Sequence, residues 1–248
     1  MEERKVPGKN ELRKREPVIQ VKNLYKVYRV GETKVYALNG VDFTMYRGEF
    51  CAIVGTSGSG KSTLLNMLAG LEKPTKGEIV IAGQHIEKLN ENQLVAFRRE
   101  RVGFIFQSYN LLGTMNAVEN VALPLSFRGV PRGRRRGMTE KYLKMVGLEK
   151  VGDHMPNQMS GGQQQRVGIA RALVVHPEII FADEPTGNLD SVTSHDVLGL
   201  LKMAARQFSQ TLILITHDRD IAQLADRIVH IEDGKIVGDT GKGSDSYA

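Results

Sequence analysis

The chain has 248 residues, of which 41% are apolar and 25% charged, a balance that excludes disordered and fibrous proteins. Much of its net charge of +6 comes from arginines clustered between residues 128 and 136, so the charge alone does not indicate a nucleic-acid partner. No stretch approaches the roughly 18 consecutive apolar residues that span a bilayer, and the N-terminal segment lacks the apolar core of a signal peptide, so we expect a cytosolic chain.

The two ends of the chain are polar and charged without periodicity. We therefore expect residues 1–17 to form a disordered basic tail and residues 240–248 a flexible one. Residues 41–45 alternate between apolar and polar side chains, which predicts a strand with one wet face. Three segments are continuous apolar runs, typical of parallel strands buried on both faces: 50–55, 179–182 and 212–215. Cys51 lies in the first run, and as a lone cysteine it excludes an internal disulfide and a cysteine-clustered zinc site.

Helical patterns follow these runs, at 61–69, 191–208 and 219–225. Near the end, Asp233-Gly234 separates two apolar runs, which is a strong hairpin signal because both residues tolerate a positive φ. Residues 108–158 lack strand patterns, and we interpret them as a helical insertion. The predicted fold is an α/β domain, 18–239, with a mostly parallel sheet and an antiparallel fringe.

A glycine-rich segment between the first buried strand and its helix has the pattern and context of a phosphate-binding loop. It reads Gly55-Thr56-Ser57-Gly58-Ser59-Gly60-Lys61-Ser62-Thr63. Its glycines allow successive backbone N–H groups to point at phosphate oxygens, and the helix N-terminus adds positive potential. Lys61 can reach the β- and γ-phosphates, and the Ser62 hydroxyl can ligate Mg²⁺.

Two further features suit nucleotide chemistry. Asp183 and Glu184 follow the second buried strand at the sheet edge where α/β proteins bind ligands; Asp183 suits Mg²⁺, and Glu184 suits a general base that polarises water. The turn Ser160-Gly161-Gly162-Gln163 precedes a helical run, 164–175. Ser160 is a good N-cap, so this turn is either a second helix-terminus phosphate site or only a capped helix.

The order of these motifs resembles the nucleotide-binding subunit of ATP-binding-cassette (ABC) transporters over residues 18–239. The motifs that carry the resemblance are the phosphate loop, Gln107 in FIFQ, SGGQQQR, the Asp183-Glu184 strand end, Asn188-Leu189-Asp190 and His217. Segments such as FQSYNLL and ADEPTGNLD resemble the subgroup that serves lipoprotein release, macrolide export and bacitracin-type resistance. Met159 stands where the family usually has leucine, a conservative exchange.

The resemblance implies a P-loop NTPase (RecA-like) core with an antiparallel β subdomain and an inserted α-helical subdomain. It also implies two copies packed head to tail around two ATP molecules with Mg²⁺. The signature turn of one copy, Ser160–Gln163, would then contact the γ-phosphate held by the other. The implied catalytic residues are Glu184, His217, Gln107 and Lys61. The implied metal ligands are Ser62, Gln107 and Asp183.

Two further roles follow from the resemblance. Asp190 would bridge the two copies, and Tyr28 would stack on adenine, with Tyr25 and Tyr36 as rivals for that role. The implied partner is an integral membrane permease, which would hold this chain at the cytoplasmic face of the membrane. The permease would dock near Tyr109, Leu111 and Leu112, unless these residues are core of the insertion.

Alternatives remain open for the function and for the arginine cluster. A soluble nucleic-acid ATPase is disfavoured, because the 99 positions from Lys61 to Ser160 hold neither sustained heptads nor cysteine pairs (160 − 61 = 99). A regulator of cell-wall remodelling shares the same motifs. The cluster Arg128–Arg136 is interpreted first as a solvated mobile loop and second as a lipid contact, and nucleic acid is not expected, because no aromatic residue is interleaved.

Overall fold

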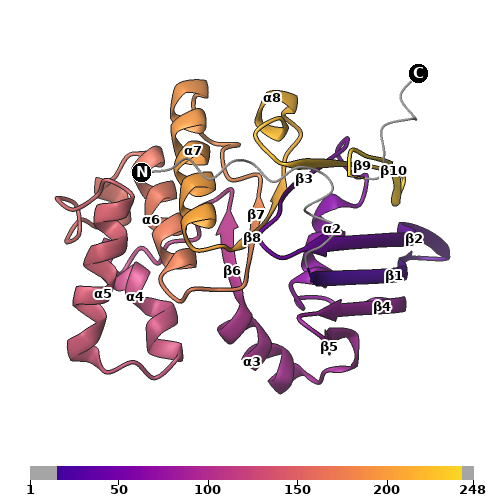
Figure 1. Ribbon diagram of the computed structural model, residues 1–248, viewed down its shortest axis with the longest axis horizontal. Helices are drawn as coiled ribbons and strands as arrows, with labels where there is room; N and C mark the ends of the chain where they lie inside the picture. The colour runs from indigo at the N-terminus through magenta and orange to yellow at the C-terminus, as the bar shows by residue number, and fades with distance from the viewer. Residues whose placement is uncertain (1–15, 242–248) are drawn as a thin grey trace.

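The computed structural model describes residues 16–241, which contain two sheets and a group of helices (Figure 1). The larger sheet has the strand order β10-β9-β3-β8-β7-β6. Its strands are β3 (Phe50–Val54), β6 (Val102–Phe106), β7 (Ile179–Asp183), β8 (Thr211–Ile215), β9 (Arg227–Glu232) and β10 (Lys235–Asp239). Every pairing is parallel except that of β9 with β10. The three predicted apolar runs form β3, β7 and β8, which confirms the prediction of a buried parallel sheet.

The second sheet is antiparallel, with the order β2-β1-β4-β5. Its strands are β1 (Pro17–Val30), β2 (Thr33–Tyr46), β4 (Lys76–Ile81) and β5 (Gln84–His85). In β2, Val41, Phe43 and Met45 are buried while Asp42 is exposed, as the alternation predicted. Helix α2 (Lys61–Leu68) shares one apolar core with both sheets.

Most of each predicted tail, 1–17 and 240–248, lies outside the described part of the chain. Residues 1–15 and 242–248 are not described, so the predictions for these two segments stay untested. Residue 17 differs from the prediction, because β1 already begins there. Proline is tolerated at the first position of a strand.

The remaining helices cover the parallel sheet and extend it to one side (Figure 1). They are η1 (Ile86–Lys88), α3 (Glu91–Arg101), α4 (Ala117–Phe127), α5 (Arg132–Met145), η2 (Pro156–Gln158), α6 (Gly161–Leu173), α7 (Ser191–Gln207) and α8 (Arg219–Ala222). Helices α4, α5 and α6 pack on one another around a second apolar core. Helix α8 is shorter than predicted, because the amides of Leu224 and Ala225 bond three residues back in tighter turns. Within residues 16–241, no helix is both long and apolar enough to cross a bilayer.

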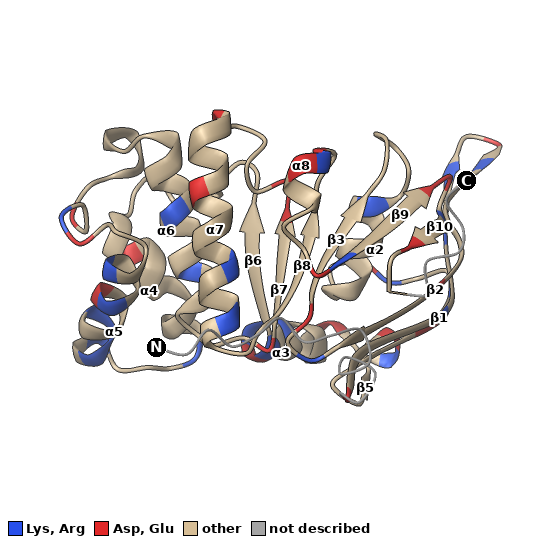
Figure 2. Cartoon of the chain, turned by 45° about the horizontal axis from the view of Figure 1, so that its top comes forward, with Lys and Arg blue, Asp and Glu red and all other residues tan. Residues whose placement is uncertain are grey.

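The arginine cluster is mainly helical, which corrects the prediction of a mobile loop. Helix α5 begins at Arg132, and only 128–131 remain as a connection after α4. Pro131 supplies the fixed φ of −58° just before the helix, and arginine is a good helix former. Arg128 is held in place by bonds to the carbonyl oxygens of Arg99, Glu100 and Val175 at 2.8, 2.7 and 2.6 Å. Figure 2 shows the resulting concentration of basic residues along α5.

Candidate active site

The phosphate loop, residues 55–63, connects β3 to α2 as its strand-loop-helix pattern predicted. Gly58 and Gly60 have φ of +79° and +105°, a region that favours glycine because it has no Cβ. A Cβ on Gly60 would also lie 2.4 Å from the carbonyl oxygen of Ala37, and one on Gly55 would lie 2.2 Å from that of Ile231. The loop therefore requires glycine at these positions for its shape and for its close approach to neighbouring backbone.

The turn between β9 and β10 is hydrogen-bonded to the phosphate loop. Asp233 and Gly234 have φ of +47° and +72°, which confirms the predicted hairpin turn. The amide of Gly234 donates to the carbonyl of Ser59 at 3.0 Å, and its carbonyl accepts from the amide of Asn39 at 2.8 Å. Sequence reasoning identified the hairpin but missed this contact, because the hairpin and the loop lie far apart in the chain.

The loop holds polar groups that suit a phosphate. The Lys61 ammonium is folded back and donates to the carbonyl oxygens of Gly55 and Thr56 at 2.9 and 2.8 Å. The Ser59 hydroxyl is buried and has no hydrogen-bond partner among the described residues. A buried ammonium held only by carbonyl oxygens and an unpartnered hydroxyl are both expected to gain hydrogen bonds from an anion in the loop.

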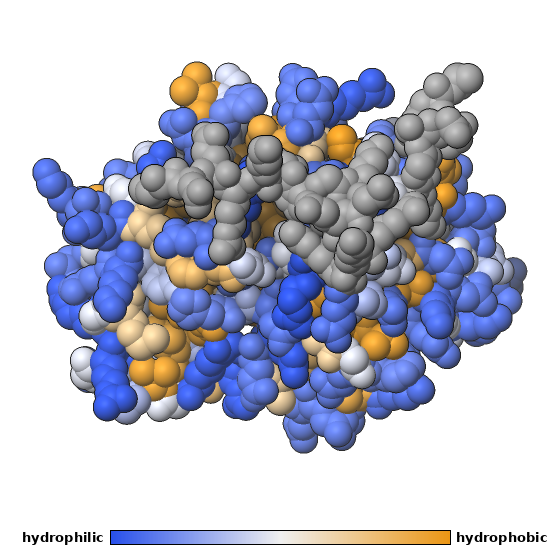
Figure 3. All heavy atoms as spheres, in the orientation of Figure 1, coloured by the Kyte–Doolittle hydropathy of each residue, from blue (hydrophilic) through white to orange (hydrophobic). Residues whose placement is uncertain are grey.

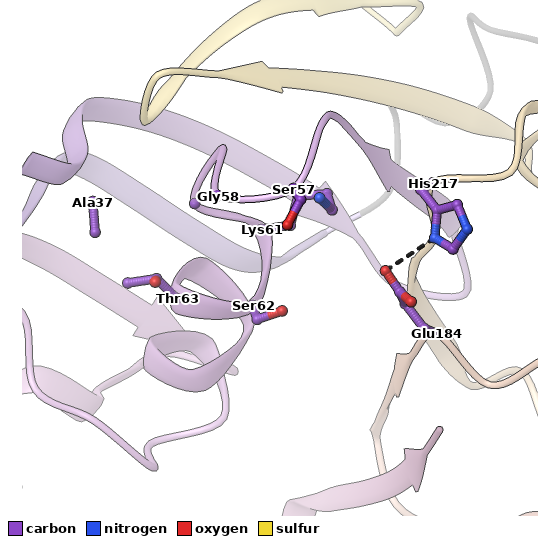
Figure 4. Close-up of a pocket in the computed structure, with 9 residues that line it drawn as sticks. Ala37, Ser57, Gly58, Lys61, Ser62, Thr63, Glu184 and His217 are labelled. Carbon is purple, nitrogen blue, oxygen red and sulfur yellow. Dashed lines mark hydrogen bonds and ion pairs between the residues drawn. The ribbon is translucent and has the colours of Figure 1, made fainter. Parts of the chain in front are cut away.

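The acidic pair lies across from the loop, at the end of β7. Asp183 is half-buried, and its burial, followed by the nearby Glu184 carboxylate, raises the pKa of the Asp183 carboxyl; Lys61 and a hydrogen bond from Ser62 act in the opposite direction. Glu184 has a φ of +43°, and its amide donates to the carbonyl of Ile215 at 3.0 Å. Its carboxylate Oε1 lies 3.2 Å from Nδ1 of His217 (Figure 4). The adjacent acids thus have different surroundings.

Part of the phosphate loop, Glu184 and His217 face one cavity of about 560 Å³, within the usual range for a small-molecule site. Asp183 and Ser59 do not line it. The cavity is lined by Ala37, Ser57, Gly58, Gly60, Lys61, Ser62, Thr63, Glu184 and His217 (Figure 4). Ala37 is the lining residue that sequence reasoning missed. It comes from β2, and no local pattern marks it.

The donor set fits Mg²⁺ bound together with phosphates. Ser62 and Asp183 supply the hard oxygen ligands that Mg²⁺ prefers, and they are close enough to share a hydrogen bond. No group of three or more His, Cys, Asp or Glu side chains within residues 16–241 could hold a metal alone. This fits an ion that takes one or two protein ligands and completes its shell with phosphate oxygens and water.

Gln107 lies at the neighbouring strand end but not in the cavity lining. It follows Phe106, which pairs with Asp183 in the register of β6 and β7. Its carbonyl accepts a hydrogen bond from the Asn188 amide at 3.0 Å, and its own Nε2 lies 3.5 Å from Asn188 Oδ1. The predicted roles of Gln107 in binding metal and water therefore stay predictions.

Tyr28 lies beside the site with its hydroxyl already engaged. The hydroxyl donates to the Glu72 carboxylate at 2.8 Å, and burial, with Glu72, raises the pKa of the phenol. The ring is 37% exposed, near Thr63 of the cavity lining, and the Lys26 ammonium lies 5.2 Å from its centroid. An exposed ring next to the lining is available for stacking, but its adenine role stays a prediction.

The signature turn stands apart from the phosphate loop within one chain. Ser160 caps α6, with its hydroxyl accepting from the Gln163 amide at 3.3 Å and the Gln163 side chain accepting from the Ser160 amide at 2.9 Å. Asp190 caps α7 by accepting from the Thr193 amide at 3.0 Å and from the Thr193 hydroxyl at 2.6 Å, and these hydrogen bonds lower the pKa of its carboxyl. None of these residues lines the cavity, and Figure 1 shows α6 and α2 on opposite sides of β3, β7 and β8.

A second cavity of about 630 Å³ is mainly apolar and lies between α3, β6, α4 and α6. We call it the apolar groove; its lining includes Leu71, Val95, Phe104, Phe106, Leu123 and Phe127. Tyr109, Leu111 and Leu112 do not line it. A role of these three residues in docking stays a prediction. Leu111 packs on the core of the helical insertion, in agreement with the alternative interpretation. Figure 3 shows apolar side chains at the surface over the lower ends of α4 and α5.

The raised pKa of Asp183 predicts a gain in stability when this side chain is neutralised. A carboxyl whose pKa is higher in the folded state than in the unfolded state binds its proton more tightly when folded, so its ionised form destabilises the fold above that pKa. Asp183→Asn should therefore raise the Tm of the nucleotide-free chain at neutral pH. The difference should shrink as the pH falls through the pKa of Asp183, which thermal unfolding across a pH series would measure. An equal or lower Tm at pH 7 would contradict it.

Comparison with known proteins agrees with this geometry. The family model described as "ABC transporter" matches residues 38–187. A macrolide export ATP-binding/permease protein of Hyphomonas neptunium is 49% identical over 225 residues, which are 91% of this chain but 35% of that protein. The chain thus spans about a third of the length of this relative. An ABC transporter ATP-binding protein of Thermotoga maritima is 45% identical over 89% of this chain and 94% of its own length.

Solved structures show the same fold. An ATP-binding cassette in a dimeric, post-hydrolysis state bound to ADP and phosphate superposes with a TM-score of 0.82 and 43% identity, over 89% of this chain and 97% of its own. A second dimeric structure of that cassette gives a TM-score of 0.83 and 44% identity.

Proposed function

The chain belongs to the ABC transporter family and has the ABC ATPase fold, and on that premise we propose that it binds and hydrolyses ATP to drive a separate membrane permease. The observation that carries the proposal is the single cavity in which the phosphate loop faces Glu184 and His217. The direct test is phosphate release from ATP by the purified chain with Mg²⁺, which should be absent when Mg²⁺ is chelated.

Different residues around the cavity have different roles in hydrolysis. The loop backbone and Lys61 bind the phosphates, with Lys61 exchanging its two carbonyl partners for phosphate oxygens. Glu184 accepts a proton from the attacking water, and His217, 3.2 Å from the Glu184 carboxylate, holds that carboxylate and faces the terminal phosphate. Mg²⁺, held by Ser62 and Asp183, would neutralise phosphate charge when bound.

A second copy of the chain completes the site in this proposal. Ser160–Gln163 form a capped helix start with open backbone amides, yet they lie outside the chain's own cavity. A head-to-tail dimer places this turn against the phosphate loop of the other copy. The solved cassette that this chain resembles is dimeric, which supports the pairing of two copies. In such a dimer, the helix start at the phosphate loop binds the chain's own nucleotide, and the helix start at the signature turn contacts the nucleotide of the other copy.

The apolar groove is the proposed docking site of the permease, at the cytoplasmic face of a membrane. It joins β6, which leads into Gln107, to α4 of the insertion and to α6. A cytoplasmic helix of the permease would bury its apolar face there. Similarity to macrolide export proteins favours an exporter. The motif resemblance to the wider subgroup extends the proposed cargo to an antimicrobial peptide or a lipoprotein, or replaces transport by mechanical coupling.

Substitution of Phe127 tests the docking site. Phe127 lines the groove and is 64% exposed. Because a surface substitution has little effect on stability, Phe127→Asp should fold normally and keep its basal ATPase rate within about twofold of the unsubstituted chain. It should abolish co-purification of the integral membrane partner from native membranes. Met203→Asp, at an equally apolar exposed residue on α7 outside the groove, is the matched control. Retention of the same membrane protein by Phe127→Asp would place docking elsewhere.

A further inference from the structure

The loop after Gln107 turns back onto α6 through two residues in the left-handed region. Tyr109 and Asn110 have φ of +58° and +48°, a conformation that is unfavourable for residues with a Cβ. Arg171 of α6 holds this turn, with Nη2 donating to the carbonyl of Tyr109 at 2.8 Å and Nη1 to that of Asn110 at 2.5 Å. Two charge-assisted hydrogen bonds from α6, the helix that begins at the signature turn, therefore hold the loop in this shape.

The Tyr109 side chain lies along α6 toward the signature turn. A Cβ on Gly161 would lie 2.8 Å from the Tyr109 hydroxyl oxygen, closer than to any other atom, and 3.4 Å from Leu189 Cδ2. A Cβ on Gly168 would lie 3.8 Å from the Tyr109 carbonyl oxygen. Gly161 and Gly168 are seven residues apart, about two helical turns, so they share one face of α6. Tyr109 thus spans this face and ends against Gly161.

Gln165 occupies the same face between the two glycines. It is fully buried, and neither its amide nitrogen nor its amide oxygen has a hydrogen-bond partner among the described residues. A Cβ on Gly168 would lie 3.9 Å from Gln165 Oε1, so Gly168 has both this amide and the Tyr109 carbonyl beside it.

The other end of the loop lies at the catalytic strand ends. Gln107 follows the residue that pairs with Asp183, and it exchanges contacts with Asn188. Gln107 is packed closely here, because a Cβ on Gly187 would lie 2.6 Å from Gln107 Nε2. Only Ser108 separates Gln107 from Tyr109. This makes Gln107–Tyr109 a three-residue covalent connection between the catalytic edge and the signature turn.

We infer that Tyr109 is a positioning residue of the signature turn. Its phenol, wedged against Gly161, carries a displacement of Gln107 to Ser160–Gly162 and so sets whether that turn fits the nucleotide of a second copy. This role rests on the proposed head-to-tail function and deepens it. Tyr109 contacts no part of the phosphate-loop cavity. It therefore acts on dimer formation and leaves nucleotide binding by one chain unchanged.

The first test measures the ATP-driven dimer in a Glu184→Gln background, where hydrolysis does not disperse it. Tyr109→Ala should weaken that dimer by about 10- to 100-fold in sedimentation experiments, the cost of a misplaced binding element. The Kd of the monomer for ATP should be unchanged. Tyr46→Ala, which removes another half-buried tyrosine at the opposite end of β3 from the phosphate loop, is the control and should dimerise normally.

The second test uses the contact with Gly161 directly and stays informative if Tyr109→Ala misfolds. Gly161→Ala should fail to dimerise because its methyl group meets the phenol oxygen at 2.8 Å. Tyr109→Phe removes that oxygen and leaves Leu189 at 3.4 Å as the nearest atom, an ordinary contact, so the double variant should regain dimerisation. Equal failure of the single and double variants, or a normal dimer in Tyr109→Ala, would overturn the inference. Failure of Glu184→Gln alone to dimerise would instead contradict the proposed function.

Discussion

Glu184→Gln is expected to lower the turnover of ATP by about 10²–10⁴-fold, because a glutamine cannot accept the proton of the attacking water. The glutamine amide has the size of the carboxylate, and the backbone N–H of residue 184 donates a hydrogen bond to the carbonyl of Ile215. The cavity should therefore keep its shape. ATP binding should therefore remain normal. Phosphate-release kinetics and equilibrium nucleotide binding on the same preparation measure the two quantities.

The same variant should also trap the dimer. With hydrolysis blocked, the ATP-bound pair has no route to the ADP state, and it should persist on a sizing column with ATP and dissociate when ATP is removed. Glu149→Gln, the same exchange at an exposed residue after α5 and outside the cavity, provides a comparison that should retain far more turnover. Near-normal hydrolysis by Glu184→Gln would remove Glu184 from the role of general base.

Lys61→Ala and Ser160→Arg are expected to fail at different steps, both with large losses of activity. Lys61→Ala removes the ammonium that faces the phosphates, so ATP binding by the single chain should weaken. Ser160→Arg leaves the cavity intact, so ATP binding should be normal, while the bulky side chain blocks the ATP-driven dimer and lowers turnover by about 10²–10³-fold. Failure of both variants at ATP binding would contradict a signature turn that acts on the partner's nucleotide.

A mixture of these two variants gives the sharper result. In a head-to-tail pair of one Lys61→Ala chain and one Ser160→Arg chain, one composite site combines the intact phosphate loop of one copy with the intact signature turn of the other. The second site carries both defects. Mixing two nearly inactive preparations should therefore restore part of the ATPase activity, whereas each variant alone at the same total concentration should not. No recovery on mixing would contradict the head-to-tail arrangement.

The parts of the site that the sequence predicted correctly are those encoded over a few neighbouring residues. The phosphate loop is contiguous, and its glycines, lysine and helix start specify their own backbone path. The Asp233-Gly234 turn likewise needs only two residues that tolerate positive φ. The buried parallel strands were visible because burial on both faces demands an unbroken apolar run.

In the arginine cluster, tertiary packing outweighs the local sequence pattern. Glycine is a weak helix former, yet Gly133 and Gly137 both lie inside α5. The buried residues Thr139, Tyr142 and Leu143 hold this helix against its neighbours, and that tertiary burial outweighs the weak helix propensity of two glycines.

Taken by itself, the sequence predicted which residues could hold phosphate, metal and a proton, and it determined that Asp183 and Glu184 lie at a strand end. Only the tertiary structure decided which of them meet. It placed Gly234 behind Ser59, the Glu72 carboxylate on the Tyr28 hydroxyl, and the Tyr109 phenol on Gly161. These partners are separated by tens to more than a hundred residues. Periodicity specifies which face of an element is buried, but the contacts between distant residues depend on how whole elements pack.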